Sequence, residues 1–137
     1  MDAKRYLKQV EMLDAKIKNK MIERQQWENM AIGLSISVDG NRVQSTGKKE
    51  KMAKSVERCV DIEAEIEILV EELVKAKQDV IATIEKLESP TEYNILHKRY
   101  IQFIDLKDIA EIYDREYTWV TTTHGRALKN VQNLLNL

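Results

Sequence analysis

Residues 52–87 read MAKSVERCVDIEAEIEILVEELVKAKQDVIATIEKL. Apolar side chains recur in this stretch at steps of three and four residues, the spacing of one face of an α-helix. That face consists of Met52, Val56, Cys59, Ile66, Val70, Leu73, Val80, Ile84 and Leu87. A second apolar edge beside it consists of Ile62, Leu69, Ala76 and Ile81. Because one partner helix cannot cover so wide a stripe, we predict a long helix over about 49–88 and a homo-oligomer, either a dimer or a tetramer.

A second amphipathic helix precedes this one. Its apolar face consists of Ala3, Leu7, Val10, Leu13, Ile17 and Met21. The pattern predicts a helix over about 2–32 that ends at Gly33, where glycine can take the left-handed cap. The Ser, Asp, Asn and Gly residues of 33–48 predict a connecting loop, in which the alternation Leu34, Ile36, Val38 is typical of a short extended piece. We therefore expect residues 1–89 to form a long antiparallel, coiled-coil-like helical hairpin that serves oligomerisation.

Charge is distributed unevenly along the chain, although its formal net charge is only −1. Residues 1–54 hold 12 Lys or Arg against 7 Asp or Glu, a net +5, and residues 55–89 hold 4 against 10, a net −6. A basic and an acidic helix attract each other when they lie side by side. We prefer this explanation of the asymmetry, and a basic arm for nucleic acid is the alternative.

Several functional classes lack their usual sequence signals. One cysteine excludes an internal disulfide, and with only two histidines the chain offers little for a structural zinc site. We expect no metal and no cofactor. We find no Gly-rich phosphate loop and no nucleophile–base pair, so we expect no enzyme. The start of the chain is not typical of a signal peptide, and no run of 18 apolar residues occurs, so we expect a cytoplasmic protein without membrane contact.

Residues 89–92, Ser-Pro-Thr-Glu, predict the start of a new helix and a domain boundary at residue 89. Ser89 can cap this helix, Pro90 suits its first position, and Glu92 completes a capping box. The apolar residues Tyr93, Leu96, Tyr100 and Phe103 then predict one helix face. We expect residues 90–137 to form a separate C-terminal domain.

Residues 105–137 predict a helix, a tight turn and a second helix, so the expected fold is all-α. Asp105 is the expected cap of the first helix, and 114–117 form the turn. Thr118 caps or opens the second helix. The predicted inward residues are Leu106, Ile109, Ala110 and Tyr113, then Val120, Ala127, Leu128, Val131 and Leu134. Two helices that cross within so few residues need a small side chain at the crossing, and Ala110 supplies it.

These residues resemble region four of bacterial sigma factors. The resemblance lies in the run 106–113 (LKDIAEIY), in Val120 and in 126–129 (RALK), with Arg99-Tyr100 similar to the end of the preceding helix. Asp114 stands where the turn glycine is usual, and Thr123 stands at a usually apolar position. The whole chain is similar to small region-four-like regulators of phages and prophages, including the ArpU-like late-gene regulators. A loop like 42–47 (RVQSTG), followed by 51–53 (KMA), is that family's sharper marker.

The resemblance implies a sequence-specific transcription regulator of phage or prophage genes in a bacterial host cell. Its partners would be double-stranded DNA and, as a further candidate, RNA polymerase. Docked in the usual way, the second helix enters the major groove by its N-terminal half. The residues then expected at DNA are Lys107, Arg115, Tyr117, Thr118, Thr121, Thr122, Gly125, Arg126 and Lys129. Among these, Arg126 suits a guanine or a phosphate, and Lys107, Arg115 and Lys129 suit phosphates.

Two other functional classes fit the same pattern of elements. A small terminase-like DNA-packaging subunit also joins a helix-turn-helix to a helical hairpin, and it assembles into rings. A purely structural coiled-coil assembly protein would not bind DNA. Oligomer size separates the first alternative from a regulator, because a dimer or tetramer favours regulation and a ring of eight or more favours packaging.

Overall fold

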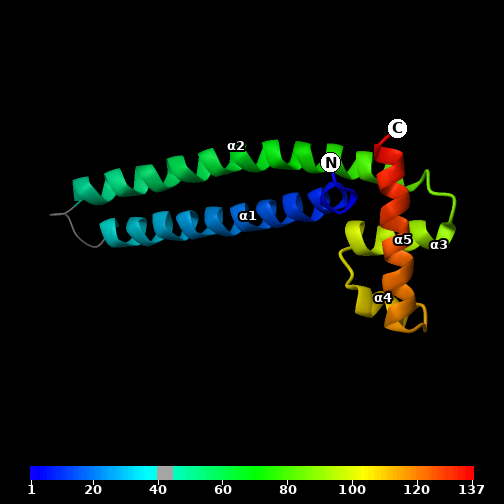
Figure 1. The fold of residues 1–137 in the computed structure, drawn as a ribbon. Coiled ribbons are helices and arrows are strands. Elements are labelled where there is room, and N and C mark those ends of the chain that lie inside the picture. The colour runs from blue at the N-terminus through cyan, green and yellow to red at the C-terminus, as the bar shows by residue number, and fades with distance from the viewer. Residues whose placement is uncertain (40–44) are drawn as a thin grey trace. The chain divides into compact units, whose positions relative to one another are not determined.

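The chain is all-helical throughout the part that the computed structural model describes, which is the backbone of residues 1–39 and 45–137 and the side chains of 1–34 and 47–137. Helix α1 spans Ala3–Asp39 and α2 spans Ser45–Ile84 (Figure 1). The shorter helices follow as α3, Pro90–Leu96, the π-helical turn η2, His97–Ile101, and α4, Leu106–Ile112. Helix α5, Tyr117–Leu135, completes the chain.

The described helices group into two compact units. Unit 1 comprises Met1–Asp14 and Glu72–Leu137, and unit 2 comprises Ala15–Glu71. In unit 1, helix α5 packs against α3 and α4 (Figure 1). In unit 2, segments of α1 and α2 lie side by side and antiparallel, as the ion pairs Lys20–Glu65 and Arg24–Glu63 show.

The main core of unit 1 joins both ends of the chain. It includes Leu7 of α1, Ile84 of α2, Leu96 of α3 and Val131 of α5, all without solvent exposure. The backbone N–H of Ala3 also donates to Oε1 of Gln132 at 2.7 Å. The start of α1 is therefore part of the same packed body as the end of α5.

This packing contradicts the predicted domain division at residue 89. Residues 90–137 do not form a compact unit of their own, because their core is completed by the start of α1 and the end of α2. The sequence pattern assigns four apolar residues to the hairpin that are in fact buried with the C-terminal segment: Leu7, Val10, Val80 and Ile84. The sequence pattern shows that these faces are apolar but not which neighbour covers them.

Both long helices have bounds that differ from those predicted, 2–32 and 49–88 with a loop over 33–48. Helix α1 continues through Gly33 to Asp39, so Gly33 is no cap and Leu34, Ile36 and Val38 are helical. A helical glycine costs only about 1 kcal/mol, which neighbouring helix formers can outweigh. Helix α2 begins at Ser45, so residues 45–47 of the family-like loop 42–47 are helical. Residues 42–44 of that loop lie outside the described residues.

The end of α2 also differs from the prediction, since the helix stops at Ile84. Turn hydrogen bonds follow, from the N–H of Lys86 to the carbonyl of Thr83 and from that of Leu87 to Ile84, both at 3.1 Å. Proline disfavours helical geometry in the residue before it, so Ser89 is extended and separates α2 from α3.

The face of α2 that pairs with α1 in unit 2 takes residues from both predicted apolar edges. Ile62, assigned to the second edge, is fully buried, whereas Val56 and Val70 are exposed. Cys59 and Ile66 of the predicted primary edge are half-buried, so the buried side of α2 combines parts of both edges. The three-and-four spacing alone cannot tell which of two neighbouring edges meets a partner helix.

Candidate nucleic-acid interface

Helices α4 and α5 meet through the tight turn formed by residues 113–116. Asp114, which stands where a turn glycine is usual, takes the left-handed conformation with φ 51°. The N–H of Arg115 closes the turn on the carbonyl of Ala110 at 2.9 Å. Ala110 and Val120 then pack in a small core with Ile109 and Ile95. The predicted helix, turn and helix are therefore present, with Ala110 buried between them.

The N-terminal caps of α4 and α5 differ from the predicted ones. Asp105 and Glu116 occupy the N-cap positions of α4 and α5, but neither side chain makes a capping hydrogen bond. Thr118 lies within the first turn of α5 and is not its cap. At α3, Ser89 does cap, since its Oγ accepts from the N–H of Glu92 at 3.3 Å. The Glu92 carboxylate itself accepts from Nδ2 of Asn130 at 2.9 Å, which ties α3 to α5.

Helix α5 has one buried face and one open face. The buried face consists of Val120, Thr123, His124, Ala127 and Val131. Of the nine residues expected at DNA, all but one are exposed and Thr121 is half-buried, and they are Lys107, Arg115, Tyr117, Thr118, Thr121, Thr122, Gly125, Arg126 and Lys129. Thr118, Thr122, Gly125 and Lys129 follow each other at helical steps, so they share one stripe. Thr121 and Arg126 border this stripe. We call the stripe and these two residues together the α5 outer face.

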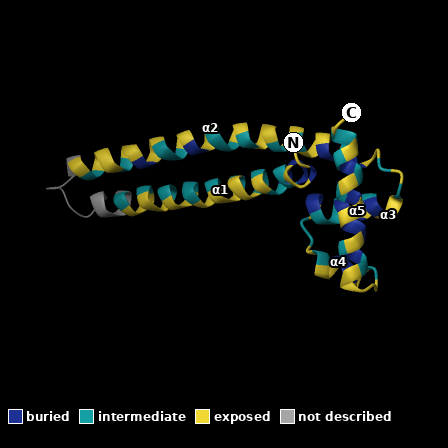
Figure 2. Cartoon of the chain, viewed as in Figure 1, coloured by how far each residue is buried: buried dark blue, intermediate teal, exposed yellow. Residues whose placement is uncertain are grey.

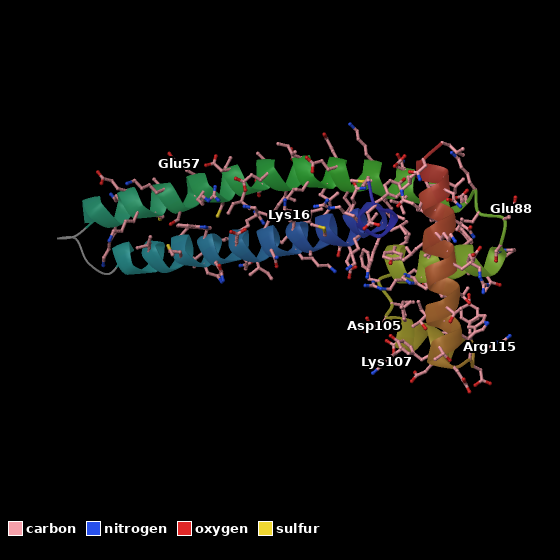
Figure 3. All side chains as sticks on the ribbon, viewed as in Figure 1. Lys16, Glu57, Glu88, Asp105, Lys107 and Arg115 are labelled. Atoms are coloured by element: carbon pink, nitrogen blue, oxygen red, sulfur yellow. The ribbon has the colours of Figure 1, made fainter. Side chains whose placement is uncertain are left out.

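Lys107, Arg115 and Tyr117 lie around the start of α5. Figure 3 shows Lys107 and Arg115 extending from the α4 end of unit 1. Lys107 and Tyr117 line one hollow with Arg99, Leu106 and Asp105. The Arg115 guanidinium lies over the Trp119 ring, 4.7 Å from its centroid. This stacking holds a cation beside the first turn of α5.

The charge of the α5 outer face differs from that of the segment around it. Residues 90–137 carry six basic and six acidic residues, a net zero. Helix α5 itself contains Arg126 and Lys129 and no acidic residue. The acidic side chains belong to α3, α4 and the connecting segments. The outer face therefore carries net positive charge within a neutral segment.

Gly125 stands in the middle of α5 without a structural reason. It is exposed, its φ is not positive, and a Cβ built on it meets nothing within 4 Å. Glycine in a helix interior costs roughly 0.5–1 kcal/mol relative to alanine. Neither backbone conformation nor packing within unit 1 accounts for this cost, so the backbone at Gly125 is open to close approach from outside.

A buried polar pair supports the outer face from behind. His124 is 9 % exposed, and its Nε2 lies 2.8 Å from the hydroxyl of Tyr100, which is 1 % exposed. Burial, together with the nearby cations Lys4 and Arg99, lowers the pKa of His124 to about 4. Burial raises the pKa of Tyr100 to about 12. Both groups are therefore neutral near pH 7, and His124 is a packed residue rather than one that faces DNA.

The sequence did not predict the turn that delivers Tyr100 to this pair. Residues 97–101 form a π-helical turn, and the N–H of Gln102 donates to the carbonyl of His97 at 3.1 Å. Phe103 then takes a left-handed φ of 60°. The wider turn buries both Tyr100 and Ile101. A helical period of 3.6 residues cannot signal such a local widening.

Thr123 occupies the inward position where an apolar residue is usual. It is 6 % exposed, and its Oγ1 donates to the carbonyl of Trp119 at 2.8 Å. A buried hydroxyl paired within its own helix loses little free energy. This explains how α5 accepts threonine on its packed face.

Comparison of the chain with models of protein families, with curated proteins and with solved structures yields no match. Within the part of the chain that the structure describes, no helix is both long and apolar enough to cross a membrane. The same residues contain no group of three or more His, Cys, Asp or Glu side chains placed to hold a metal ion.

Proposed function

We propose that the protein is a DNA-binding transcription regulator without catalytic activity, and that α4, the turn and α5 act as a helix-turn-helix. The observation that carries this proposal is the α5 outer face, which is exposed except for the half-buried Thr121, is free of acidic residues, and consists of threonines, Gly125, Arg126 and Lys129. Threonine hydroxyls and basic side chains are the groups that bind phosphates and base edges. The sequence resemblance to sigma region four supports the same surface.

In this proposal α5 lies in the major groove and α4 crosses the DNA backbone. Arg126 reaches a base edge or a phosphate, and Gly125 lets the helix backbone approach the DNA closely. Lys107 and Arg115 neutralise phosphates beside the start of α5. We further propose that the regulated genes are those of a phage or prophage in the bacterial cytoplasm, and that RNA polymerase is contacted at the promoter, as in the region-four-like regulators.

Arg126→Ala is expected to weaken binding to a selected DNA site by about 1–3 kcal/mol if Arg126 reads a base, with relaxed preference at one base position. If Arg126 contacts only phosphate, the loss is similar for every sequence and the salt dependence of binding becomes shallower. Fluorescence titration at several salt concentrations distinguishes the two. Met12→Ala is the control, because Met12 is 62 % exposed on α1 and should not affect binding. Full DNA binding by a variant in which Arg126, Thr121 and Thr122 are all replaced by alanine would exclude the α5 outer face as the DNA-binding surface.

Gly125→Ala separates stability from binding. Because the added Cβ meets no atom of the protein, the variant is expected to be more stable by roughly 0.5–1 kcal/mol. DNA binding is expected to weaken nevertheless, since the methyl group lies where the DNA approaches. Gly33→Ala is the matched control, because Gly33 is also helical and open. It should gain similar stability, measured by thermal denaturation, and keep full DNA affinity. Unchanged affinity of Gly125→Ala would remove Gly125 from the contact surface.

A further inference from the structure

The residues of unit 2 whose side chains are described bury very little apolar surface. Figure 2 shows that the α1–α2 hairpin away from the N-terminus is mostly exposed or intermediate in burial. Among the described residues of unit 2, Ile62 is the only fully buried apolar side chain, and Ser55 the only buried polar one. The other described positions of the α1–α2 seam in unit 2 are half-buried, and they include Ile17, Cys59 and Ile66. Two helices with so small a core are marginal in water, because most of their stability must come from buried packing. The described part of unit 2 therefore has an incomplete core.

The face that would supply the missing contacts is open on one side of the α1–α2 seam. Val56 and Val60 of α2 are 50 % and 58 % exposed. Val56 borders an apolar hollow of about 360 Å³ that is also lined by Ala31, Ile32 and Met52. A second hollow, of about 610 Å³, is lined by Met21 and Ile66 and by the carboxylates of Glu63 and Glu67. Arg24 lines both hollows, so they adjoin.

The exposed residues of α2 on this side follow a heptad. Positions 49, 53, 56, 60, 63 and 67 alternate steps of four and three, and they hold Lys, Ala, Val, Val, Glu and Glu. Such a stripe favours pairing with another helix. Charge along α2 is also segregated, because residues 48–58 hold five basic and two acidic residues and residues 59–71 hold five acidic and no basic ones.

We propose that a second copy of the chain covers this face, with the two α2 helices antiparallel about a two-fold axis at residue 58. Val56 and Val60 both lie two residues from that midpoint. Val56 of one copy therefore packs against Val60 of the other copy. Lys49 and Glu67 both lie nine residues from it, so each pairs with the other across the interface. Unit 2 carries ten basic and ten acidic residues, so two copies do not repel each other.

The proposed self-pairing does not depend on DNA binding, and its test needs none. Sedimentation equilibrium of the full chain at micromolar concentration is expected to give twice the monomer mass of 16.0 kDa. Val60→Glu is expected to raise the dimer dissociation constant by about 100-fold or more, since it buries an unpaired charge. Ile68→Glu is the matched control, because Ile68 is a branched apolar residue that is 59 % exposed on the same helix, about a quarter turn away.

Charge exchange tests the antiparallel register. Lys49→Glu and Glu67→Lys are each expected to weaken self-association by about 10-fold, because each places two like-charged pairs in the dimer. A mixture of the two variants restores both opposite pairs, so it is expected to form a mixed dimer of wild-type strength. A monomeric wild-type chain, or equal effects of Val60→Glu and Ile68→Glu, would overturn the proposal. A dimer whose mixed variants show no recovery would overturn the register.

Discussion

Leu7→Ala is expected to lower the free energy of unfolding of unit 1 by about 2–5 kcal/mol, although Leu7 is far in sequence from the proposed DNA-binding helix. Leu7 has no solvent exposure, and it belongs to the core that contains Ala127 and Val131 of α5. Removing its side chain leaves a cavity in that core. Because the cavity lies behind α5, we expect loss of stability and loss of DNA binding to occur together.

Chemical denaturation of the full chain, followed by DNA titration at the same temperature, checks this prediction. Met12→Ala is the control, since Met12 lies on the same helix and is 62 % exposed, and it should change the unfolding free energy by less than about 0.5 kcal/mol. The same reasoning predicts that a fragment of residues 90–137 does not fold alone. A folded, DNA-binding fragment would show that the start of α1 is dispensable, contrary to the shared core.

Acidification from pH 7 to pH 4 is expected to remove roughly 3 kcal/mol of stability through His124 alone. The pKa of His124 falls to about 4 in the folded chain, against about 6.5 in an unfolded one. Between these values the unfolded chain binds a proton that the folded chain does not, so falling pH favours unfolding. The stabilising effect is complete above about pH 6.5 and is lost progressively down to about pH 4.

Comparison with His124→Gln isolates this effect from the carboxylates that also titrate in acid. The variant is expected to be less stable than the wild type at pH 7, because the Tyr100 hydrogen bond is altered, and the difference should shrink as the pH falls. His97→Gln is the control. Burial also lowers the pKa of the half-buried His97, so this variant should show a smaller change of the same sign. A constant difference between wild type and His124→Gln over the whole range would contradict a neutral, buried His124.

Local signals in the sequence predicted the start of α3 and the turn between α4 and α5 correctly. Pro90 and Ser89 mark the start of α3, and Asp114 marks the turn between α4 and α5, because few residue types suit these positions. The apolar spacing also placed Val120, Ala127 and Val131 on the buried face of α5. Propensity and periodicity are sufficient where a residue's role is decided within a few neighbours.

Roles that depend on distant partners could not be predicted in this way. Nothing in the spacing links Leu7 to Val131, or Tyr100 to His124, because these pairs are joined only by tertiary packing. The spacing also could not distinguish the exposed Val56 and Val70 of α2 from the residues that meet α1, since neighbouring apolar positions differ only in what covers them. Glycine is common at helix ends, so the sequence predicts an end at Gly33, but α1 continues through it to Asp39.

The central claim is that the α5 outer face reads DNA, and selection from a pool of random double-stranded DNA tests it most directly. The purified full-length wild-type chain is expected to enrich fragments that share one sequence motif. The Arg126→Ala chain, selected in parallel, is expected to lose the preference at one position of that motif or to bind the whole pool more weakly. If the wild-type chain retains no DNA, or retains fragments without any common sequence, the protein is not the sequence-specific regulator proposed here.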